Sequence, residues 1–155
     1  MKLGNIIKNC GTVTTKGDLT MEVNGLTSDS RKVVPGTMFI AVKGFAGDGH
    51  KFIASALAKG AAAIMYEDPQ ELEAQVNAAR QEGIVNADGA AFVQVENSRH
   101  AEAMAAADFY GNPSHELTLV GITGTNGKTT TTTLLKEMLE RELGAKVGLL
   151  GTNKN

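Results

Sequence analysis

Residues 117 to 133 of this 155-residue chain join an apolar run, a glycine-rich turn, one lysine and a row of threonines. The apolar run from Leu117 to Ile122 has the length of a buried strand. Gly124 and Gly127 permit a tight turn and a close approach of the backbone to a ligand. When a helix follows such a turn, its free N–H groups and positive dipole end face a bound anion. The segment therefore predicts a phosphate-binding loop and nucleotide chemistry.

The loop differs from the common P-loop in one respect. That motif has four residues between its first glycine and Gly-Lys-Thr, and here Ile122 stands at the first position. An ordinary strand-turn-helix without a ligand is therefore an alternative interpretation. The five threonines from 129 to 133 disfavour it, because together they cost a helix roughly 3 kcal/mol relative to alanine. An apolar stripe of leucines and a methionine further on predicts that a helix follows the loop.

Two strings in this sequence resemble those of a known family. The segment Thr123–Thr131, TGTNGKTTT, is similar to the ATP loop of the Mur ligases of peptidoglycan synthesis. Far upstream, the strings LTSDSR (26–31), PG (35–36), MFIAVKG (38–44) and DGHKFI (48–53) are similar to the amino-terminal domain of the same family. The resemblance covers essentially the whole chain. It implies an α/β fold, with a small Mur-ligase amino-terminal substrate domain followed by the first βαβ unit of a P-loop-like ATP-binding domain.

The resemblance also implies an activity, that of an ATP-dependent ligase. Within the family, the chain is most similar to the member that adds the third amino acid. That reaction joins a diamino acid, diaminopimelate or lysine, to UDP-N-acetylmuramoyl-L-alanyl-D-glutamate through an acyl phosphate. The sequence does not distinguish the two diamino acids, nor does it fix an oligomeric state.

Other functions stay open. The family member that adds D-alanyl-D-alanine shares the Asp-Ser-Arg string, but the Thr125-Asn126 pair disfavours it. A nucleotide-binding or UDP-sugar-binding module without catalysis is compatible with the same loop. A P-loop GTPase is a weaker alternative, because no guanine-reading motif follows.

The resemblance assigns roles to the residues of the loop. Lys128 is the catalytic cation, which steadies the β and γ phosphates of ATP, and Thr129 or Thr130 holds Mg²⁺. The backbone N–H groups that face the phosphates belong to Gly124, Thr125, Asn126 and Gly127.

The upstream string implies a second binding site, for the UDP-sugar. Hydroxyls and arginine suit ribose and phosphate oxygens, and the resemblance implies that the four residues from 28 to 31 bind a uridine nucleotide, chiefly through Ser28 and Ser30. Taken without the resemblance, the same residues favour a solvated loop in which Asp29 and Arg31 simply pair with each other. The resemblance adds three residues of the following stretch to this site: Phe45, Ala46 and Gly47.

Composition narrows the class of protein. A net charge of −2 gives no electrostatic case for nucleic acid or an anionic membrane surface. No apolar run approaches the ~20 residues of a membrane span, and the start has no signal-peptide pattern, so a soluble cytoplasmic protein is expected. The single cysteine, Cys10, excludes an internal disulfide and is expected near the core. His50, His100 and His115 lack the spacing of a metal site and are interpreted as structural.

Strands and helices are expected to alternate along the chain. The predicted strands are 38–42, 62–66, 91–95, 117–122 and 146–150, and the predicted helices are 50–59, 69–80, 98–110 and one after the loop. We place a domain boundary near Asn97. Residues 1–97 would then form the UDP-substrate-binding domain, and 98–155 the start of the central ATP-binding domain. One βαβ unit cannot cover both faces of a sheet, so the sequence is interpreted as an amino-terminal fragment with little ligase activity alone.

Overall fold

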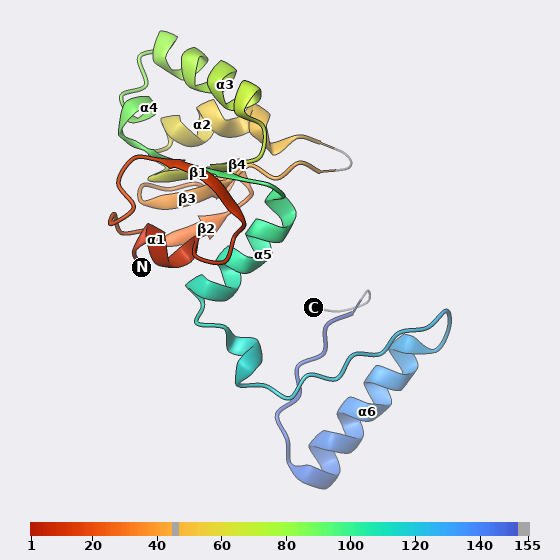
Figure 1. Ribbon diagram of the computed structural model, residues 1–155. Coiled ribbons are helices and arrows are strands. Elements are labelled where there is room, and N and C mark those ends of the chain that lie inside the picture. Colours follow the sequence, from red (N-terminus) through yellow and green to blue (C-terminus); the bar gives the residue numbers. More distant parts are fainter. Residues whose placement is uncertain (45–46, 152–155) are drawn as a thin grey trace. The chain divides into compact units, whose positions relative to one another are not determined.

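The computed structural model describes residues 1–44 and 47–151. The chain divides into two compact units, Met1–Pro113 and Ser114–Asn155, and each is described by itself (Figure 1). Phe45 and Ala46, which were predicted to contact the substrate, lie outside the described residues.

The first unit is built on a five-stranded sheet with the strand order β1-β5-β4-β3-β2. The strands are β1 (Thr12–Lys16), β2 (Gly25–Thr27), β3 (Thr37–Ile40), β4 (Ala63–Tyr66) and β5 (Ala91–Val95). Strands β2 to β5 run parallel, whereas β1 pairs antiparallel with β5. The carboxyl ends of four neighbouring strands therefore meet at one edge of the sheet.

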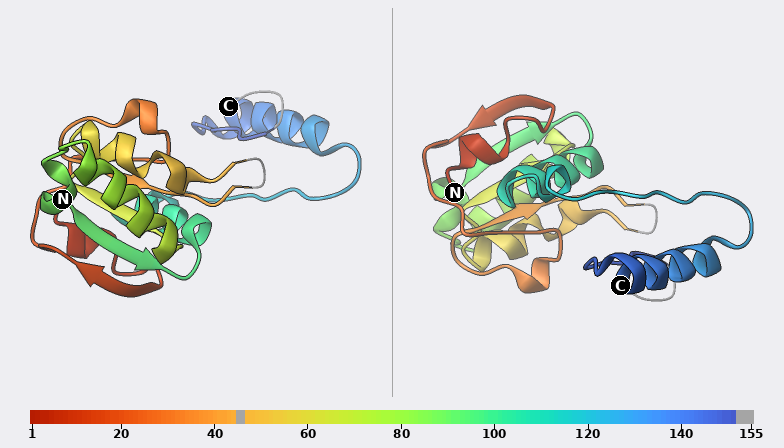
Figure 2. Two further views of the ribbon diagram at one scale, coloured as in Figure 1. Left: turned by 90° about the horizontal axis from the view of Figure 1, so that it is seen from above. Right: turned by 90° about the horizontal axis from the view of Figure 1, so that it is seen from below.

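Helices cover both faces of this sheet (Figures 1 and 2). The α-helices of the first unit are α1 (Leu3–Ile6), α2 (Ile53–Ala58), α3 (Pro69–Gln81), α4 (Asn86–Gly89) and α5 (Ser98–Phe109). Two short 3₁₀ helices of this unit are η1 (Ser30–Lys32) and η2 (Gly49–Phe52), and a third, η3 (Pro113–His115), spans the point where the chain passes into the second unit. Helices α2, α3 and α4 pack on one face, and α1 and α5 pack on the other. The unit is thus a three-layer α/β structure, which confirms the predicted fold class.

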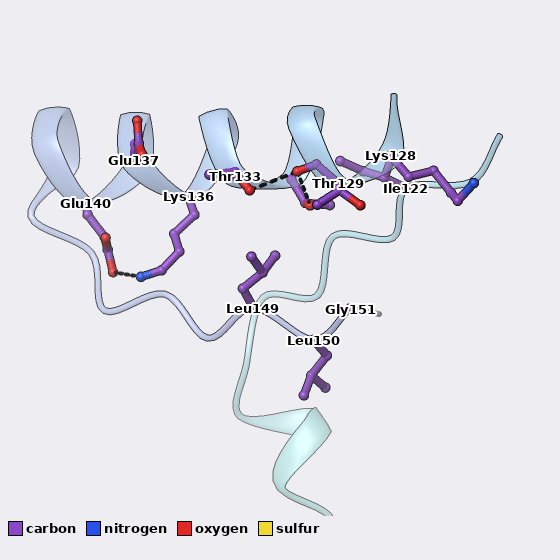
Figure 3. A pocket seen from close by; sticks show the side chains of 11 residues that line it. Ile122, Lys128, Thr129, Thr133, Lys136, Glu137, Glu140, Leu149, Leu150 and Gly151 are labelled. Atoms are coloured by element: carbon purple, nitrogen blue, oxygen red, sulfur yellow. Dashed lines mark hydrogen bonds and ion pairs between the residues drawn. The ribbon is translucent and has the colours of Figure 1, made fainter. Parts of the chain in front are cut away.

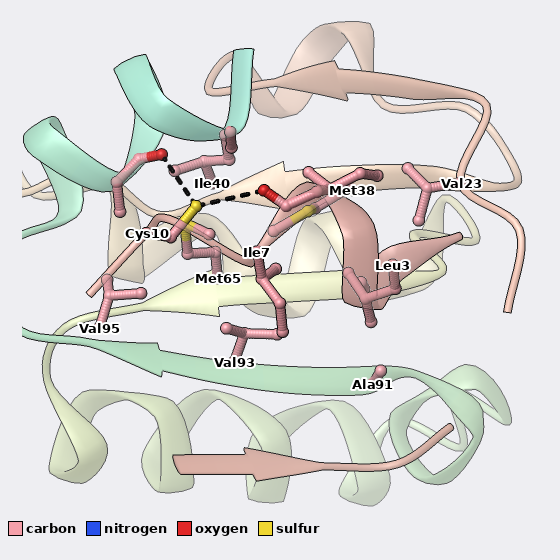
Figure 4. Packing of buried hydrophobic residues seen from close by; sticks show 14 residues of the cluster. Leu3, Ile7, Cys10, Val23, Met38, Ile40, Met65, Ala91, Val93 and Val95 are labelled. Carbon is pink, nitrogen blue, oxygen red and sulfur yellow. Dashed lines mark hydrogen bonds between the residues drawn. The ribbon is translucent and has the colours of Figure 1, made fainter. Parts of the chain in front are cut away.

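The two cores follow from the alternation of side chains along the strands. In β5, Ala91, Val93 and Val95 face α1 and α5, whereas Phe92 faces the opposite helices (Figure 4). Each buried valine or phenylalanine contributes about 1.5–3 kcal/mol relative to an exposed one. Helix α5 presents fully buried alanines such as Ala101 to the sheet, and these small side chains let the helix lie close to it.

Cys10 lies within the core between α1 and α5, as expected (Figure 4). Its Sγ donates to the backbone oxygens of Ile6, at 3.4 Å, and of Ala101, at 3.6 Å. Burial, with a smaller effect of Asp108, raises the pKa of this thiol to about 11. The thiol therefore stays protonated and unreactive at neutral pH.

Helix α5 belongs to the first unit, so the chain divides later than the boundary predicted near Asn97. Its buried face packs on α1 and the sheet. Near the C-terminal end of α5, Asn9 Nδ2 donates to both carboxylate oxygens of Asp108, at 3.2 and 3.0 Å. The helix has its apolar partner here, and the chain leaves the unit only after Pro113.

Local sequence signals located the longer elements well. Helix α3 begins at Pro69, and Asp68 Oδ1 accepts the N–H groups of Gln70 and Glu71 at 2.9 and 3.2 Å. An aspartate directly before a proline is a local signal for a helix that begins in this way. The strand predicted at 91–95 is confirmed, as are β3, β4 and α5 within one or two residues.

The second unit contains one long helix, α6 (Lys128–Leu143), which confirms the helix predicted after the loop. The strands predicted at 117–122 and 146–150 are wrong, because neither segment is assigned as a strand. A strand requires a ladder of backbone hydrogen bonds to a neighbour. Within residues 114–151 no neighbouring strand is present, and side chains such as Leu119 and Leu150 are 70% and 88% exposed. In the described part of the chain, no helix combines the length and apolarity that a membrane span requires.

Candidate functional site

The glycine loop and the start of α6 have the geometry of an anion cradle. Gly127 is the N-cap residue, with a φ of 78° in the left-handed region, and Gly124 has a φ of 148°. Glycine adopts both conformations without strain, whereas other residues do not. Gly127 O accepts the first intrahelical bond, from Thr131 N at 2.9 Å. The N–H groups of residues 128–130 precede that bond, and no side chain caps them. They are therefore available to an anion.

The charged side chain of Lys128 contacts the backbone of the same loop. Its ammonium group donates to the backbone oxygens of Gly124 and Thr125, the latter at 3.3 Å. The predicted cation and the predicted loop are thus brought together by local contacts. The side chains of Thr125 and Asn126 are exposed beside it.

The five threonines divide into two groups. The hydroxyls of Thr132 and Thr133 donate to Thr129 O at 3.0 and 2.8 Å, so both are engaged by their own helix. Such bonds are a common way for threonine to be accommodated within a helix. The hydroxyls of Thr129 and Thr130 have no such bond among the described residues. The threonine run is therefore partly structural, and the two earlier hydroxyls stay as candidate metal ligands.

A cavity of about 760 Å³ lies along the flank of α6, on the side that faces residues 149–151 (Figure 3). Ile122, Leu149 and Leu150 supply apolar lining, and Lys136 pairs with Glu140 at 2.8 Å on the helix side. The cavity meets the phosphate loop only at Lys128 and Thr129. The anion position is at the start of the helix, so this cavity borders the candidate site rather than containing it.

The predicted UDP-sugar residues lie at the carboxyl edge of the sheet in the first unit. Ser28 follows β2 and is exposed, and Ser30 begins η1 and is half-buried. Neither hydroxyl has a hydrogen bond within the described residues, so both can donate to a ligand. The backbone oxygen of Ser30 accepts from Lys59 Nζ at 2.8 Å, which fixes the turn. In parallel sheets, ligands bind outside the carboxyl ends of the strands.

The loop after β3 reaches the same edge. Gly47, the one described residue of the three predicted there, is exposed, and its backbone oxygen accepts from Gly44 N at 2.8 Å. A hollow of about 330 Å³ lies beside this loop, between Lys43 and the segment Glu67–Gln70. The structure thus brings two of the predicted substrate-binding segments to neighbouring strand ends.

Two residues at this edge were not predicted as functional. Ser98 is fully buried and binds Glu67, and His50 is fully buried and binds Asp48. Of the adjacent acidic residues Glu67 and Asp68, only Asp68 caps α3. Glu67 turns to Ser98, whose backbone N–H, followed by its hydroxyl, lowers the pKa of this carboxyl against the opposing effect of burial. Ser98 and Glu67 are 31 positions apart, so no local pattern shows their contact. His50 lies only two positions after Asp48, but the sequence does not show that its ring is buried. Among the described residues no group of three or more potential metal-binding side chains occurs.

Comparisons with known protein families cover both units. Residues 22–110 match the Mur ligase family, catalytic domain, and residues 122–155 match the Mur ligase middle domain. The two matches follow each other in the chain with a short gap, which contains the end of the first unit.

Curated relatives align along nearly the whole chain. A UDP-N-acetylmuramoyl-L-alanyl-D-glutamate–2,6-diaminopimelate ligase of Clostridioides difficile is 40% identical over 99% of this chain. A ligase of the same name from Bacteroides fragilis is 43% identical over 98% of it. The chain spans 28% of the length of each relative.

Solved structures show the same fold. The MurF ligase of Thermotoga maritima, solved in complex with ADP, is 36% identical, with a TM-score of 0.52 over 77% of this chain and 24% of that chain. MurF of Acinetobacter baumannii has a TM-score of 0.63 at 24% identity, over 90% of this chain and 27% of that chain, and supports the fold alone.

Proposed function

Because the chain belongs to the Mur ligase family, we propose that it supplies the UDP-substrate site and the ATP phosphate loop of a ligase of peptidoglycan synthesis. The first unit would bind UDP-N-acetylmuramoyl-L-alanyl-D-glutamate, and the second would bind the phosphates of ATP. The observation that carries the proposal is the uncapped start of α6 behind a glycine loop that holds its own lysine.

The residues of the loop fit a bound nucleoside triphosphate. Free N–H groups at the start of a helix, together with its dipole, favour an anion at that point. Lys128 would move from the loop oxygens, which are neutral acceptors, to the phosphates, where a charge-assisted hydrogen bond is stronger. Thr129 or Thr130 would bind Mg²⁺, since a hydroxyl with no protein partner is a suitable oxygen ligand. The ADP complex of the Thermotoga relative supports a nucleotide in this family.

The serines of the first unit fit the uridine-nucleotide end of the substrate. Asp29 and Arg31 pair with each other, which leaves the hydroxyls of Ser28 and Ser30 as the donors for ribose or phosphate oxygens. Gly47 stands on the neighbouring loop, where the absence of a side chain leaves space for a ligand, since a Cβ there would touch nothing within 4 Å.

ATP would transfer its γ-phosphoryl group to the glutamyl carboxylate, giving an acyl phosphate and ADP. The amine of a diamino acid would then attack the acyl carbon and displace inorganic phosphate, forming the amide. The contribution of these residues is positioning and charge stabilisation, which dominate phosphoryl transfer. The backbone N–H groups and Lys128 would orient the phosphates, and the serines would hold the other substrate by its nucleotide. Neither unit needs to supply a nucleophile for this reaction.

The names of the relatives favour diaminopimelate over lysine as the diamino acid. A second function, the addition of D-alanyl-D-alanine, is favoured by the fold similarity to MurF, but the aligned MurF chains are less similar in sequence. We therefore propose the diaminopimelate-adding reaction. The cytoplasmic location predicted from the sequence stays a prediction.

Calorimetric titration of this chain with UDP-N-acetylmuramoyl-L-alanyl-D-glutamate, and separately with ATP and Mg²⁺, tests the proposal. We expect both ligands to bind, each with one site. A folded chain that binds ATP but no UDP-linked ligand would contradict the role of the first unit. A chain that binds neither would contradict the proposal as a whole.

A further inference from the structure

One buried hydroxyl ties together the carboxyl ends of three neighbouring strands. Ser98, the first residue of α5, donates from Oγ to Glu67 Oε2 at 2.8 Å, and its backbone N–H donates to the same oxygen at 2.9 Å. The same Oγ accepts the backbone N–H of Lys43 at 3.1 Å. Because Lys43 follows β3, Glu67 follows β4 and Ser98 follows β5, this hydroxyl links three strand ends.

The buried imidazole of His50 makes a second link at the same strand ends. His50 Nε2 accepts the backbone N–H groups of Glu67 and Asp68 at 3.0 and 3.1 Å. A nitrogen that accepts two N–H groups carries no proton, so the neutral ring is protonated at Nδ1. Nδ1 then donates to Asp48 Oδ1 at 2.5 Å. Asp48 is thereby held to the end of β4.

The two links hold opposite legs of one short loop. Lys43 and Asp48 face each other in an antiparallel bridge, and Gly49 N donates to Val42 O at 2.9 Å. Ser98 holds the Lys43 leg, and His50 holds the Asp48 leg. Arg99 Nε also donates to Lys43 O at 3.2 Å, so both backbone polar groups of Lys43 are bound.

This arrangement is not required by the apolar cores. Among the described residues only three polar side chains are buried, and Ser98 and His50 are two of them. A buried polar group costs free energy unless it is fully hydrogen-bonded, so such residues tend to specify one local geometry. Both lie where the sheet presents its loops to a ligand, and not within either hydrophobic cluster.

We propose that Ser98 and His50 are positioning residues, which fix the base of the loop at Lys43 and Asp48 so that the carboxyl edge of the sheet is preorganised for a uridine-nucleotide ligand. The inference rests on the proposed function of the first unit. Neither residue touches the ligand in this proposal. A binding site is held in its productive geometry when a second layer of hydrogen bonds supports the contacting groups, and these two side chains supply that layer.

The test compares Ser98→Ala with Asn86→Ala, each in the full chain. Asn86 is a matched control, because its Nδ2 donates to Ala61 O at 2.6 Å and so supports a backbone turn before β4, at the opposite edge of the sheet. Two quantities are measured: the exchange rate of the Lys43 amide proton, and the affinity for UDP-N-acetylmuramoyl-L-alanyl-D-glutamate. For Ser98→Ala we expect the exchange to be about tenfold faster and the affinity about tenfold weaker, since one lost hydrogen bond is worth about that factor. For Asn86→Ala we expect neither change.

A conservative pair of histidine variants gives an independent readout. In His50→Gln, the amide oxygen can still accept the N–H groups at 67 and 68, whereas His50→Ala removes every bond of the ring. We expect the glutamine to restore much of the affinity that the alanine loses, when both variants are measured well below their melting temperatures. Equal losses of affinity in both would overturn the positioning role of the ring.

The outcomes separate this inference from the function on which it rests. If wild type binds no UDP-linked ligand, the proposed function of the first unit fails, and the inference fails with it. If wild type binds but Ser98→Ala leaves the Lys43 exchange or the affinity unchanged, only the positioning role is overturned. Equal losses of affinity in the Ser98 and Asn86 variants would also overturn it, because they would reflect general stability.

Discussion

The carboxylate of Asp29 binds Arg31 through three hydrogen bonds within one turn. Asp29 Oδ1 accepts from the backbone N–H of Arg31 at 3.0 Å and from its Nε at 2.9 Å, and Oδ2 accepts from Arg31 Nη2 at 2.9 Å. The first of these caps η1, and the other two form a bidentate ion pair. The charged residues of the LTSDSR string therefore satisfy each other, and the hydroxyls on either side of Asp29 are left for a ligand.

The pairing predicts an acidic titration of Asp29. Hydrogen bonds from the side chain and then the backbone of Arg31 lower the pKa of this carboxyl from 3.8 to about 2. Since the folded-state pKa is depressed, the turn is fully stabilised above pH 3.8 and loses that stabilisation as the pH falls through about 2. A carbon-13 NMR titration of the Asp29 carboxyl should have its midpoint near 2, and Arg31→Gln should move it upward. A midpoint near 3.8 in the wild-type chain would contradict the pairing.

Ser28 and Ser30 should matter for the UDP-linked ligand and not for stability. Both hydroxyls lack a partner in the described structure, so Ser28→Ala and Ser30→Ala should leave the melting temperature unchanged. Each loses one hydrogen bond to the ligand, about 0.5–1.5 kcal/mol, which weakens the affinity by roughly two- to tenfold. Calorimetric titration measures this loss. Ser55→Ala, at an exposed position of α2, is the matched control and should bind as wild type does.

Lys128 should be required for ATP and dispensable for folding. Its ammonium contacts only exposed loop oxygens in this structure, so Lys128→Met should melt close to wild type. A charge-assisted bond to phosphate contributes about 1.5–3 kcal/mol, so the dissociation constant for ATP with Mg²⁺ should rise roughly ten- to hundredfold. Lys136→Met removes a lysine of the same helix that pairs with Glu140, and it should bind ATP normally. Equal losses in the two variants would indicate an effect of net charge rather than a phosphate contact.

Mutation should separate the threonines whose hydroxyls bond within α6 from those whose hydroxyls have no partner in the described structure. Thr133→Val removes a hydroxyl that already donates to Thr129 O, so it should change neither ATP affinity nor its dependence on Mg²⁺. Thr129→Val removes a hydroxyl without a partner and should abolish most of the Mg²⁺ enhancement of ATP binding. The comparison is clean because valine keeps the β-branch in both variants. If only Thr130→Val had this effect, the metal ligand would be the next residue of the loop.

The sequence determined the elements whose signals are local. Helix α3 carries its proline and its aspartate cap within two residues, and β5 alternates apolar side chains that face two cores. Strands β1 and β2 were missed, because β1 is exposed along its whole length and β2 has only three residues, so neither has a hydrophobic pattern. The strands around the loop were predicted from apolar runs, but a strand also needs a paired neighbour, which is a tertiary property.

The same distinction between local and distant contacts applies to the two candidate sites. The phosphate loop is predictable, because Gly124, Gly127 and Lys128 lie within a few residues of one another and Lys128 Nζ donates to Gly124 O inside the same loop. The contact between Ser98 and Lys43 joins residues that are 55 positions apart, and no single sequence shows such a pair. A buried serine beside a helix cap has no local pattern that distinguishes it from any other serine.

Gly49 should tolerate no side chain, because the backbone of Val42 lies against it. A Cβ at this position would lie 2.7 Å from Val42 N and 2.8 Å from Val42 O, and neither atom belongs to a flexible side chain. Gly49→Ala must therefore push apart the two legs of the loop, at a cost of about 1–3 kcal/mol, which lowers the melting temperature of a unit of this size by roughly 4 °C or more. Gly47→Ala, two residues earlier, is the matched control, since its Cβ would touch nothing within 4 Å. Thermal unfolding followed by circular dichroism compares them, and equal melting temperatures would show that the loop base is not closed as described.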